Sequence, residues 1–306
     1  MSAAGGGVLA VDGGQSTIRV RHSSGAAADA PGVSWGRADT IAATADAVLS
    51  AWRSAGSPPT TIAVLGLTTI PENVRELDRL AQLIAATTGA ERLLICDDGV
   101  TSHAGALGGE WGIVLAVGTG VACVARPRTG GTKFIGGHGF LLGDEGGAFW
   151  IGRAGLASAL RAADGRGIPT RLQSSAAAAF GDLDGLPIRI HADPRAVDSI
   201  ARFAPAVVHA AREGDPAARE ILDSALVELT RCVRTGWAAA GGEPGAPLAV
   251  VGRLAEELRP ELEASFRELA GSVDLRPALG GGLDGAERLA FEASAYGDAV
   301  HVWTKG

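Results

Sequence analysis

Cysteine is scarce in this chain of 306 residues: there are three, Cys96, Cys123 and Cys232, and none belongs to a CxxC pair. Three thiols cannot form a fully paired disulfide framework, and such usage is typical of a reducing compartment, so we expect a cytoplasmic protein. No apolar run approaches the ~20 residues that cross a bilayer. The first residues also lack the basic and apolar segments of a signal peptide. We therefore expect no membrane partner.

Basic residues are fewer than acidic ones, 27 against 34, and the net charge of −7 argues against a surface that binds nucleic acid. The sequence contains no GxxxxGK[ST] loop and no HExxH. These absences argue against a P-loop nucleotidase and a zinc protease. The length and the hydrophobic fraction of 46% instead fit a soluble protein of about two domains.

A repeated segment gives the first positive signal. The tetrapeptide VLAV occurs at 8–11 and again at 114–117, and each copy runs into a glycine-rich turn and a second strand-like segment. This repeat predicts two similar domains, each opening with a hairpin whose turn faces a shared cleft. Elsewhere helical and strand patterns alternate, which predicts a layered α/β fold. We expect helices over 40–54, 73–88, 99–107, 149–163 and 284–296, and strands over 61–69, 92–96 and 248–252.

The two turns, DGG at 12–14 and GTG at 118–120, have the composition of anion-binding loops. Glycines let backbone N–H groups approach a phosphate closely, and Asp12, at a strand end, could orient Mg²⁺ through water. Either turn alone could be an ordinary hairpin turn. Because each turn follows a copy of VLAV, the two together predict a pair of loops that bind a polyphosphate from two sides.

Acidic residues mark two further segments. Asp97 and Asp98 end a strand, where α/β folds place ligands, although one of them could simply cap the next helix. The glycine-dense segment 136–147 contains Asp144, which could bind sugar hydroxyls or a metal, or could cap the helix that follows. His138 in that segment could be a ligand or a surface residue.

Taken together, these motifs resemble the BadF/BadG/BcrA/BcrD-type ATPase family, and within it the N-acetylglucosamine kinases of the sugar kinase, Hsp70 and actin superfamily. The matching segments are LAVDGGQST, ICDDGVTSHAGALGG, GIVLAVGTG, GGHGFLLGDEGGAFWIGRAGL, AAREGDPAAREIL and LAVVGRL. The resemblance implies two ribonuclease-H-like domains with an ATP and sugar cleft between them. The expected domains are 1–110 and a nucleotide-binding 111–285, with a C-terminal helix over about 286–304 packing back on the first domain.

The resemblance also implies roles for individual residues. Asp98 matches the base that deprotonates the sugar hydroxyl, and Asp12 matches an acidic position near Mg²⁺. Residues implied in ATP or phosphate binding are Gly13, Gly14, Gln15, Ser16, Thr17, Gly118, Thr119, Gly120, Ala211 and Gly252. Residues implied in sugar binding are Ser34, Thr68, Asp98, Gly137, His138 and Asp144. The chain departs from the family pattern where His138 replaces a Trp and Gly147 replaces a Ser.

The activity that follows is ATP-dependent phosphorylation of an amino sugar, first of all N-acetylglucosamine at its 6-hydroxyl, with ATP and Mg²⁺ as cofactors. Because His138 stands in the sugar-contact pair, glucosamine is the alternative acceptor. A non-sugar ATPase of the same family, such as an activator of electron transfer, and a non-catalytic sugar sensor are the other classes. Whether the chain forms a homodimer stays open.

Overall fold

The computed structural model describes residues 6–14, 17–33, 39–68, 70–71 and 73–306. Its strands are β1 (Gly7–Gly13), β2 (Thr17–His22), β3 (Ala27–Pro31), β4 (Thr60–Leu67), β5 (Arg92–Asp97), β6 (Gly112–Val117), β7 (Val121–Arg126), β8 (Lys133–Gly136), β9 (Ala246–Val251), β10 (Val273–Arg276) and β11 (Val300–Thr304). Its α-helices are α1 (Thr40–Ser54), α2 (Val74–Thr88), α3 (Asp98–Ala106), α4 (Ala148–Ala163), α5 (Leu172–Phe180), α6 (Leu186–Ala192), α7 (Ala196–Ala201), α8 (Ala204–Arg212), α9 (Pro216–Ala239), α10 (Arg253–Glu257), α11 (Arg259–Ser265) and α12 (Gly282–Glu292).

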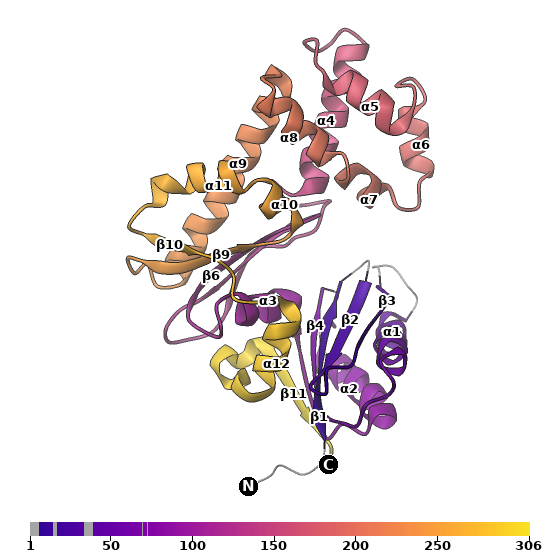
Figure 1. The fold of residues 1–306 in the computed structure, drawn as a ribbon, viewed down its shortest axis with the longest axis vertical. Helices are drawn as coiled ribbons and strands as arrows, with labels where there is room; N and C mark the ends of the chain where they lie inside the picture. Colours follow the sequence, from indigo (N-terminus) through magenta and orange to yellow (C-terminus); the bar gives the residue numbers. More distant parts are fainter. Residues whose placement is uncertain (1–5, 15–16, 34–38, 69, 72) are drawn as a thin grey trace.

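The strands form two sheets that share a five-stranded topology, to which the first sheet adds β11 at its edge (Figure 1). The orders are β11-β5-β4-β1-β2-β3 and β10-β9-β6-β7-β8. In each sheet an antiparallel meander of three strands is extended by two parallel strands, β4 and β5 in one and β9 and β10 in the other. Both VLAV copies lie in the first strand of a meander, β1 and β6. The chain therefore has the predicted α/β architecture of two ribonuclease-H-like units.

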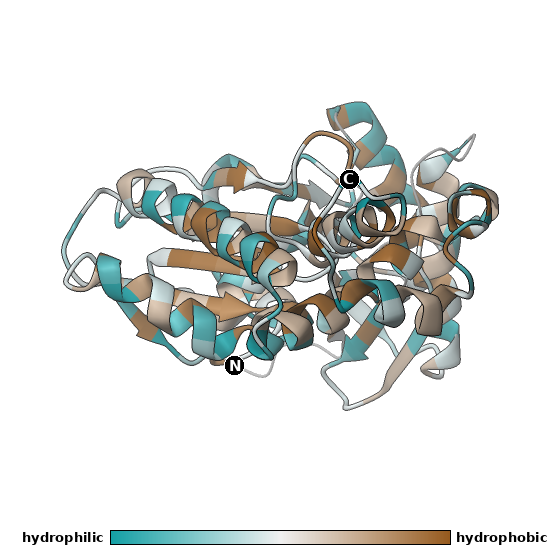
Figure 2. Cartoon of the chain, turned by 90° about the horizontal axis from the view of Figure 1, so that it is seen from above, coloured by the Kyte–Doolittle hydropathy of each residue, from teal (hydrophilic) through white to brown (hydrophobic). Residues whose placement is uncertain are grey.

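Helices cover both faces of the first sheet, and the alternation of β1 explains why. Leu9 and Val11 pack into the apolar cluster formed with α1 and α2, whereas Val8 and Ala10 pack into the cluster formed with α3 and α12. Such two-sided burial produces a continuous apolar run in the sequence. Figure 2 shows hydrophobic strands of the chain between helices that carry hydrophilic residues on their outer sides.

Helix α3 lies between the two sheets and contacts both. Val100 and Ala104 pack with the first sheet, whereas Ala106 and Leu107 pack on the second sheet. Helix α12 crosses α3 so closely that a Cβ on Gly285 would lie 1.8 Å from the carbonyl oxygen of Thr101. The residues at the start of α3 are therefore placed where the two halves of the molecule meet.

The C-terminal segment differs from the helix expected over about 286–304. Helix α12 ends at Glu292, a 3₁₀ segment covers Ala293–Ala299, and β11 then pairs antiparallel with β5. Gly297 has a φ of 54°, which interrupts helical geometry before the strand. Val300 packs into one apolar cluster and Trp303 against another, as expected for an edge strand whose side chains alternate between faces.

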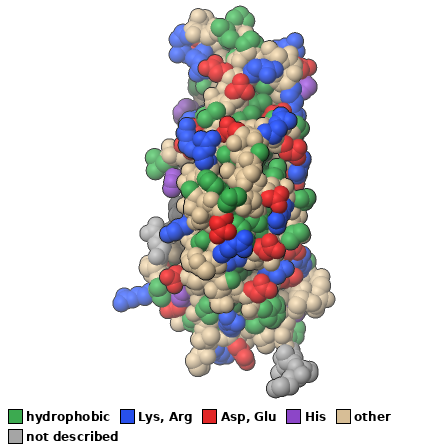
Figure 3. Space-filling model, turned by 90° about the vertical axis from the view of Figure 1, so that its left-hand side faces the viewer, with side chains coloured by type: hydrophobic (Ala, Val, Ile, Leu, Met, Phe, Trp, Pro, Cys, Tyr) green, Lys and Arg blue, Asp and Glu red, His purple; other side chains and the backbone are tan. Residues whose placement is uncertain are grey.

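Charged side chains of both signs are interspersed over the face shown in Figure 3. Over the described part of the chain, many charged side chains form exposed pairs, such as Arg276 with Asp274 at 2.7 Å and Arg234 with Glu268 at 2.6 Å. Exposed pairs of this kind contribute little to stability. Over the described ranges, no helix is both long and apolar enough to cross a bilayer.

Candidate active site

The first glycine turn connects β1 to β2 and packs against β4. A Cβ on Gly13 would lie 2.6 Å from Cδ2 of Leu67, so only glycine fits there without displacing that side chain. Gly14 donates its N–H to the carbonyl of Thr17 at 2.9 Å, which closes the turn. Gln15 and Ser16 lie outside the described residues, as does Ser34. Their predicted roles therefore stay predictions.

The second glycine turn connects β6 to β7 and is held from behind by α4. The N–H groups of Ala148 and Phe149 donate to the carbonyls of Gly118 and Thr119, at 2.9 and 3.0 Å. The side chain of Thr119 is exposed. A Cβ on Gly118 would meet no atom within 4 Å. The absence of a side chain at Gly118 therefore leaves open space in front of the turn, as a bound phosphate requires.

Gly252 closes the second turn from the β9 side. Its φ is +108°, and a Cβ there would lie 2.4 Å from the carbonyl oxygen of Val117, the last residue of β6. Both the backbone conformation and the space require glycine at this position. Gly252 therefore lies beside the second turn, where it would have to be if both segments contact the same nucleotide.

The glycine-dense loop is fastened to the second turn by Asp144. Its carboxylate accepts hydrogen bonds from the backbone N–H groups of Val121 and Gly139. Burial is the largest influence on this carboxyl and raises its pKa above the ordinary value. Asp144 has a φ of 60° and does not cap α4, whose N-cap is Gly147. The alternative that Asp144 is a helix cap is therefore wrong.

Two predicted sugar contacts sit on the same loop. Gly137 has a φ of 72° and donates its N–H to the carbonyl of Val121 at 2.9 Å. His138 follows it with an exposed side chain. The second turn and the loop therefore form one connected surface of backbone and polar groups.

Three carboxylates gather at the carboxyl ends of β1 and β5. Asp97 is the N-cap of α3 and accepts the N–H of Gly99 at 2.8 Å. Burial and the neighbouring charge of Asp98 raise the pKa of Asp97 to about 6. Burial likewise raises the pKa of Asp98 and of Asp12, and the charges of Asp12 and Asp98 repel each other. Because Asp97 supplies the cap, the alternative that Asp98 is only a cap is wrong.

Thr68 holds the Asp98 side chain in place. Its hydroxyl donates to Oδ2 of Asp98 at 2.5 Å and also lies 3.2 Å from the carbonyl oxygen of Gly13. Gly99, next to Asp98, lies against the second sheet, because a Cβ there would stand 2.8 Å from Val124. Asp98 is thus fixed beside the first turn at the junction of the two halves.

One charged residue at the site escaped the sequence analysis. Arg19 in β2 lies opposite Asp12 in the cross-strand register and approaches it to 3.4 Å, with a side chain that is 58% exposed. The pairing follows from the hairpin, in which Gly13 is opposite Ile18. Counting outward from the turn could therefore have placed a cation beside Asp12.

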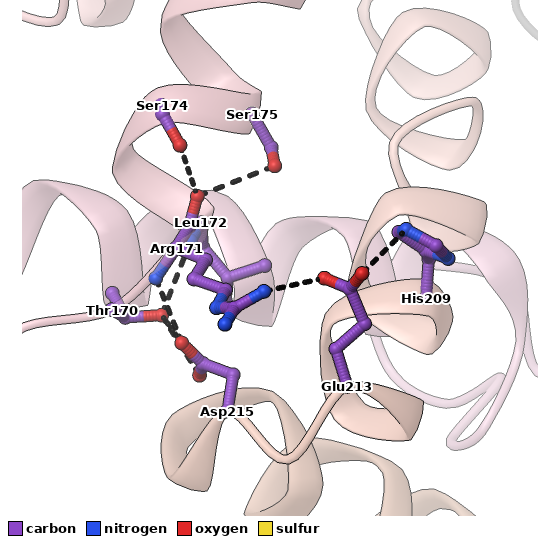
Figure 4. Close-up of polar contacts among 8 residues, drawn as sticks. All are labelled: Thr170, Arg171, Leu172, Ser174, Ser175, His209, Glu213 and Asp215. Carbon is purple, nitrogen blue, oxygen red and sulfur yellow. Dashed lines mark hydrogen bonds and ion pairs between the residues drawn. The ribbon is translucent and has the colours of Figure 1, made fainter.

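Ala211 is a buried residue of the second half of the chain. It belongs to α8, is 2% exposed and packs in the core of the second half. The polar residues near it make structural contacts (Figure 4): Asp215 caps α9 and accepts the Thr170 hydroxyl at 2.9 Å, and Glu213 pairs with Arg171 at 2.7 Å. The side chain of Ala211 offers almost no surface to a nucleotide, so a contact would have to come from its main chain, and its role stays a prediction.

The chain belongs to the BadF/BadG/BcrA/BcrD ATPase family, whose model matches residues 11–274. A curated relative, the N-acetylmuramic acid/N-acetylglucosamine kinase of Clostridium acetobutylicum, is 33% identical over 103 residues. That match covers 33% of this chain and 31% of the relative's length.

Two solved structures resemble nearly the whole chain. A proposed N-acetylglucosamine kinase from Chromobacterium violaceum is 29% identical with a TM-score of 0.74, covering 93% of this chain and 98% of that one. A second proposed N-acetylglucosamine kinase, from Porphyromonas gingivalis, is 17% identical with a TM-score of 0.70, covering 92% and 97%. The second likeness concerns the fold alone.

The residues present fit the ATP and Mg²⁺ that an ATPase family implies. The open space at Gly118 suits a phosphate, and the carboxylate of Asp12 is a hard oxygen donor of the kind Mg²⁺ prefers. Within the described part of the chain no three His, Cys, Asp or Glu side chains are grouped as a metal cage. That is compatible with Mg²⁺, which usually takes one or two carboxylates and completes its shell with water and substrate phosphates.

Proposed function

We propose that this protein is an ATP-dependent sugar kinase that phosphorylates an amino sugar at its 6-hydroxyl, with N-acetylglucosamine as the first acceptor to test. The observation that carries the proposal is the position of Asp98, a half-buried carboxylate bound to Thr68 beside the carbonyl of Gly13 in the first glycine turn. Family membership and the names of the relatives support the same activity.

In this proposal Asp98 is the general base. Phosphoryl transfer is mainly a matter of positioning and charge stabilisation, so the protein must orient the acceptor hydroxyl for in-line attack and remove its proton. A carboxylate whose pKa is raised by burial is a stronger base than an exposed one. Asp98 would hydrogen-bond the sugar hydroxyl and accept its proton as the bond to phosphorus forms.

The two glycine turns would hold the phosphates. The first turn, at Gly13 and Gly14, would lie against them, and the N–H groups of Thr119 and Gly120 would face them, since those of Gly14 and Gly118 already donate to the carbonyls of Thr17 and Gly120. Arg19 would add a positive charge. Mg²⁺, when bound, would neutralise negative charge on the phosphates, with Asp12 orienting it through water.

The loop with Gly137, His138 and Asp144 would hold the sugar from the other side. Two of the lone-pair sites on the Asp144 carboxylate are taken by Val121 and Gly139, which leaves others for a sugar hydroxyl. We further propose domains of 1–110 and 111–285, with the C-terminal segment returning to the first. Their closure around the substrates would exclude water and so limit wasteful ATP hydrolysis.

An assay of ADP release across hexoses and amino sugars tests the proposal. An amino sugar should give the highest kcat/KM, and the 6-deoxy form of the preferred sugar should not be phosphorylated. A higher kcat/KM for glucose would contradict the substrate class. ATP hydrolysis that no sugar stimulates would instead favour the non-sugar ATPase.

Glucosamine is the second candidate because the exposed His138 stands where the family has Trp. If glucosamine is the acceptor, it should give a higher kcat/KM than N-acetylglucosamine in the same assay.

The cysteines argue against an activator that holds an iron–sulfur cluster between subunits. Cys96 and Cys123 are buried in strands of the two sheets, and Cys232 is half-buried in α9. Thiols inside two separate sheets cannot reach one cluster at a subunit interface.

A further inference from the structure

Thr68 contacts both the first glycine turn and the carboxylate of Asp98, two parts of the proposed site whose relative position matters for the reaction. It lies one residue beyond β4, where its backbone N–H donates to the carbonyl of Gly13 at 2.9 Å. Its hydroxyl reaches Oδ2 of Asp98 at 2.5 Å. One residue therefore joins the carboxylate to the main chain of the first glycine turn.

The hydroxyl has one proton and two acceptors within reach. The carbonyl of Gly13 is 3.2 Å away and already accepts the backbone N–H of Thr68, whereas Oδ2 of Asp98 is 2.5 Å away and negatively charged. Hydrogen bonds to an ionised acceptor are shorter and stronger than neutral ones. The proton therefore goes to Asp98, and Oδ2 is occupied.

We propose that Thr68 is the positioning residue of the base: its hydroxyl occupies Oδ2 of Asp98, fixes the plane of the carboxylate and leaves Oδ1 to take the sugar proton. This inference rests on the proposed function. The sugar O–H bond breaks and its proton moves to Oδ1, the sugar oxygen bonds to the γ-phosphorus, and the bond from that phosphorus to the β-phosphate oxygen breaks to release ADP. Thr68 acts through Asp98 and need not touch the sugar, which differs from the sugar contact expected from the sequence.

A positioning role for Thr68 predicts a change in the pKa of Asp98 that a packing role would not produce. A hydrogen bond to the charged form of a carboxyl lowers its pKa, so removing the Thr68 hydroxyl should raise the pKa of Asp98. The Asp98 carboxyl also accepts the N–H of Gly99 and is hydrogen-bonded to the carboxyl of Asp97. The other charged groups nearby are Asp12 and, beyond it, Arg19. All of these stay in place when Thr68 is changed.

The test compares Thr68→Val, which keeps the volume, with Thr68→Ser, which keeps the hydroxyl. Thr68→Val should lower kcat by about 10- to 100-fold and move the acidic limb of the kcat/KM profile to higher pH. Thr68→Ser should stay within about threefold of the wild type, since the donor remains. Thr68→Ala serves as the second variant if Thr68→Val does not fold.

Thr101→Val is the matched control. The Thr101 hydroxyl donates to the main-chain carbonyl of Asp98 at 2.9 Å and not to its carboxylate. Its loss should change the melting temperature without moving the pH profile. If Thr68→Val raises only the KM of the sugar, with kcat and the pH profile unchanged, Thr68 is a sugar contact and the positioning role is wrong. A Thr68→Ser enzyme as slow as Thr68→Val would overturn it as well.

A measurement without turnover separates this inference from the proposed function. In protein labelled with ¹³C at aspartate Cγ, Asp98→Asn assigns the Asp98 signal, and a pH titration of that signal gives its pKa. The pKa should be higher in Thr68→Val than in the wild type whatever the acceptor is. If no sugar is phosphorylated but the pKa rises, the proposed function fails and the contact stands. An unchanged pKa overturns the positioning role even in an active kinase.

Discussion

A Cβ on Gly120 would stand 2.3 Å from Oδ2 of Asp144, so the second glycine turn and the glycine-dense loop meet without room for a side chain. Two residues away, a Cβ on Gly118 would meet no atom within 4 Å. Glycine is therefore needed at these two positions for different reasons. At Gly120 the protein itself fills the space, and at Gly118 the space is open to a ligand.

This contrast predicts different effects of side chains at the two glycines. Gly118→Val should fold normally but weaken ATP binding by about tenfold or more, because its side chain would fill the open space in front of the turn and cost a phosphate at least one charge-assisted hydrogen bond. Gly120→Ala should instead lower the melting temperature, because Asp144 must move. Calorimetry with a non-hydrolysable ATP analogue measures the first effect and thermal unfolding the second. Unchanged nucleotide affinity in Gly118→Val would contradict a phosphate site at this turn.

Arg19 should contribute to phosphate binding when Mg·ATP is present. It is exposed and pairs only loosely with Asp12, at 3.4 Å, so it can turn toward an incoming phosphate. Arg19→Ala should raise the KM of Mg·ATP by about tenfold, and Arg19→Lys should restore part of the loss. Arg166→Ala, which removes an exposed arginine paired with Asp164 in the helical region, is the control. Equal steady-state constants for Arg19→Ala and the wild type would exclude this role.

Asp97 should make the fold less stable as the pH rises. Its pKa is raised from 3.8 to about 6, so the folded state binds more protons than the unfolded state between these values. Stability then falls as pH increases through that window. Asparagine keeps the cap and removes the charge, so Asp97→Asn should melt roughly 2–4 °C higher than the wild type at pH 7.5, with the difference vanishing near pH 4.

Asp39 provides the control for that pH effect. It also caps a helix, α1, but hydrogen bonds from the backbone and from Arg79 lower its pKa. The contribution of Asp39 to stability therefore rises with pH, whereas that of Asp97 falls. Asp39→Asn should therefore be no more stable than the wild type at pH 7.5. The turnover of Asp97→Asn should change little, because its carboxylate serves as a cap. A melting difference for Asp97→Asn that is independent of pH would contradict the raised pKa.

The long elements and the repeat were predictable because their signals are local. The helix over 73–88 is observed as α2, with Asn73 as its N-cap and Gly89 as its C-cap in the left-handed conformation. The VLAV copies identified the first strands of both sheets because these strands are buried on both faces. Such features depend on composition within a short window.

The elements that escaped prediction depend on distant partners. Strand β3 has the sequence AADAP and β8 has KFIG, which carry little apolar alternation, and each is a strand because it pairs with its neighbour in a meander. The same holds for β11, which continues a helical pattern in the sequence but pairs with β5. The partners of Asp98 and Asp144 could not be predicted either, because Thr68 and Val121 reach them only through the fold.

The most direct test of the central claim is the turnover of Asp98→Asn. Asparagine keeps the size of the side chain and can still accept the Thr68 hydroxyl, but it cannot take a proton. We expect kcat to fall by about 10²- to 10⁴-fold, with ATP affinity nearly unchanged and no fall in melting temperature, because the base is lost and the cap at Asp97 remains. An Asp98→Asn enzyme that turns over at a near-normal rate would show that Asp98 is not the base.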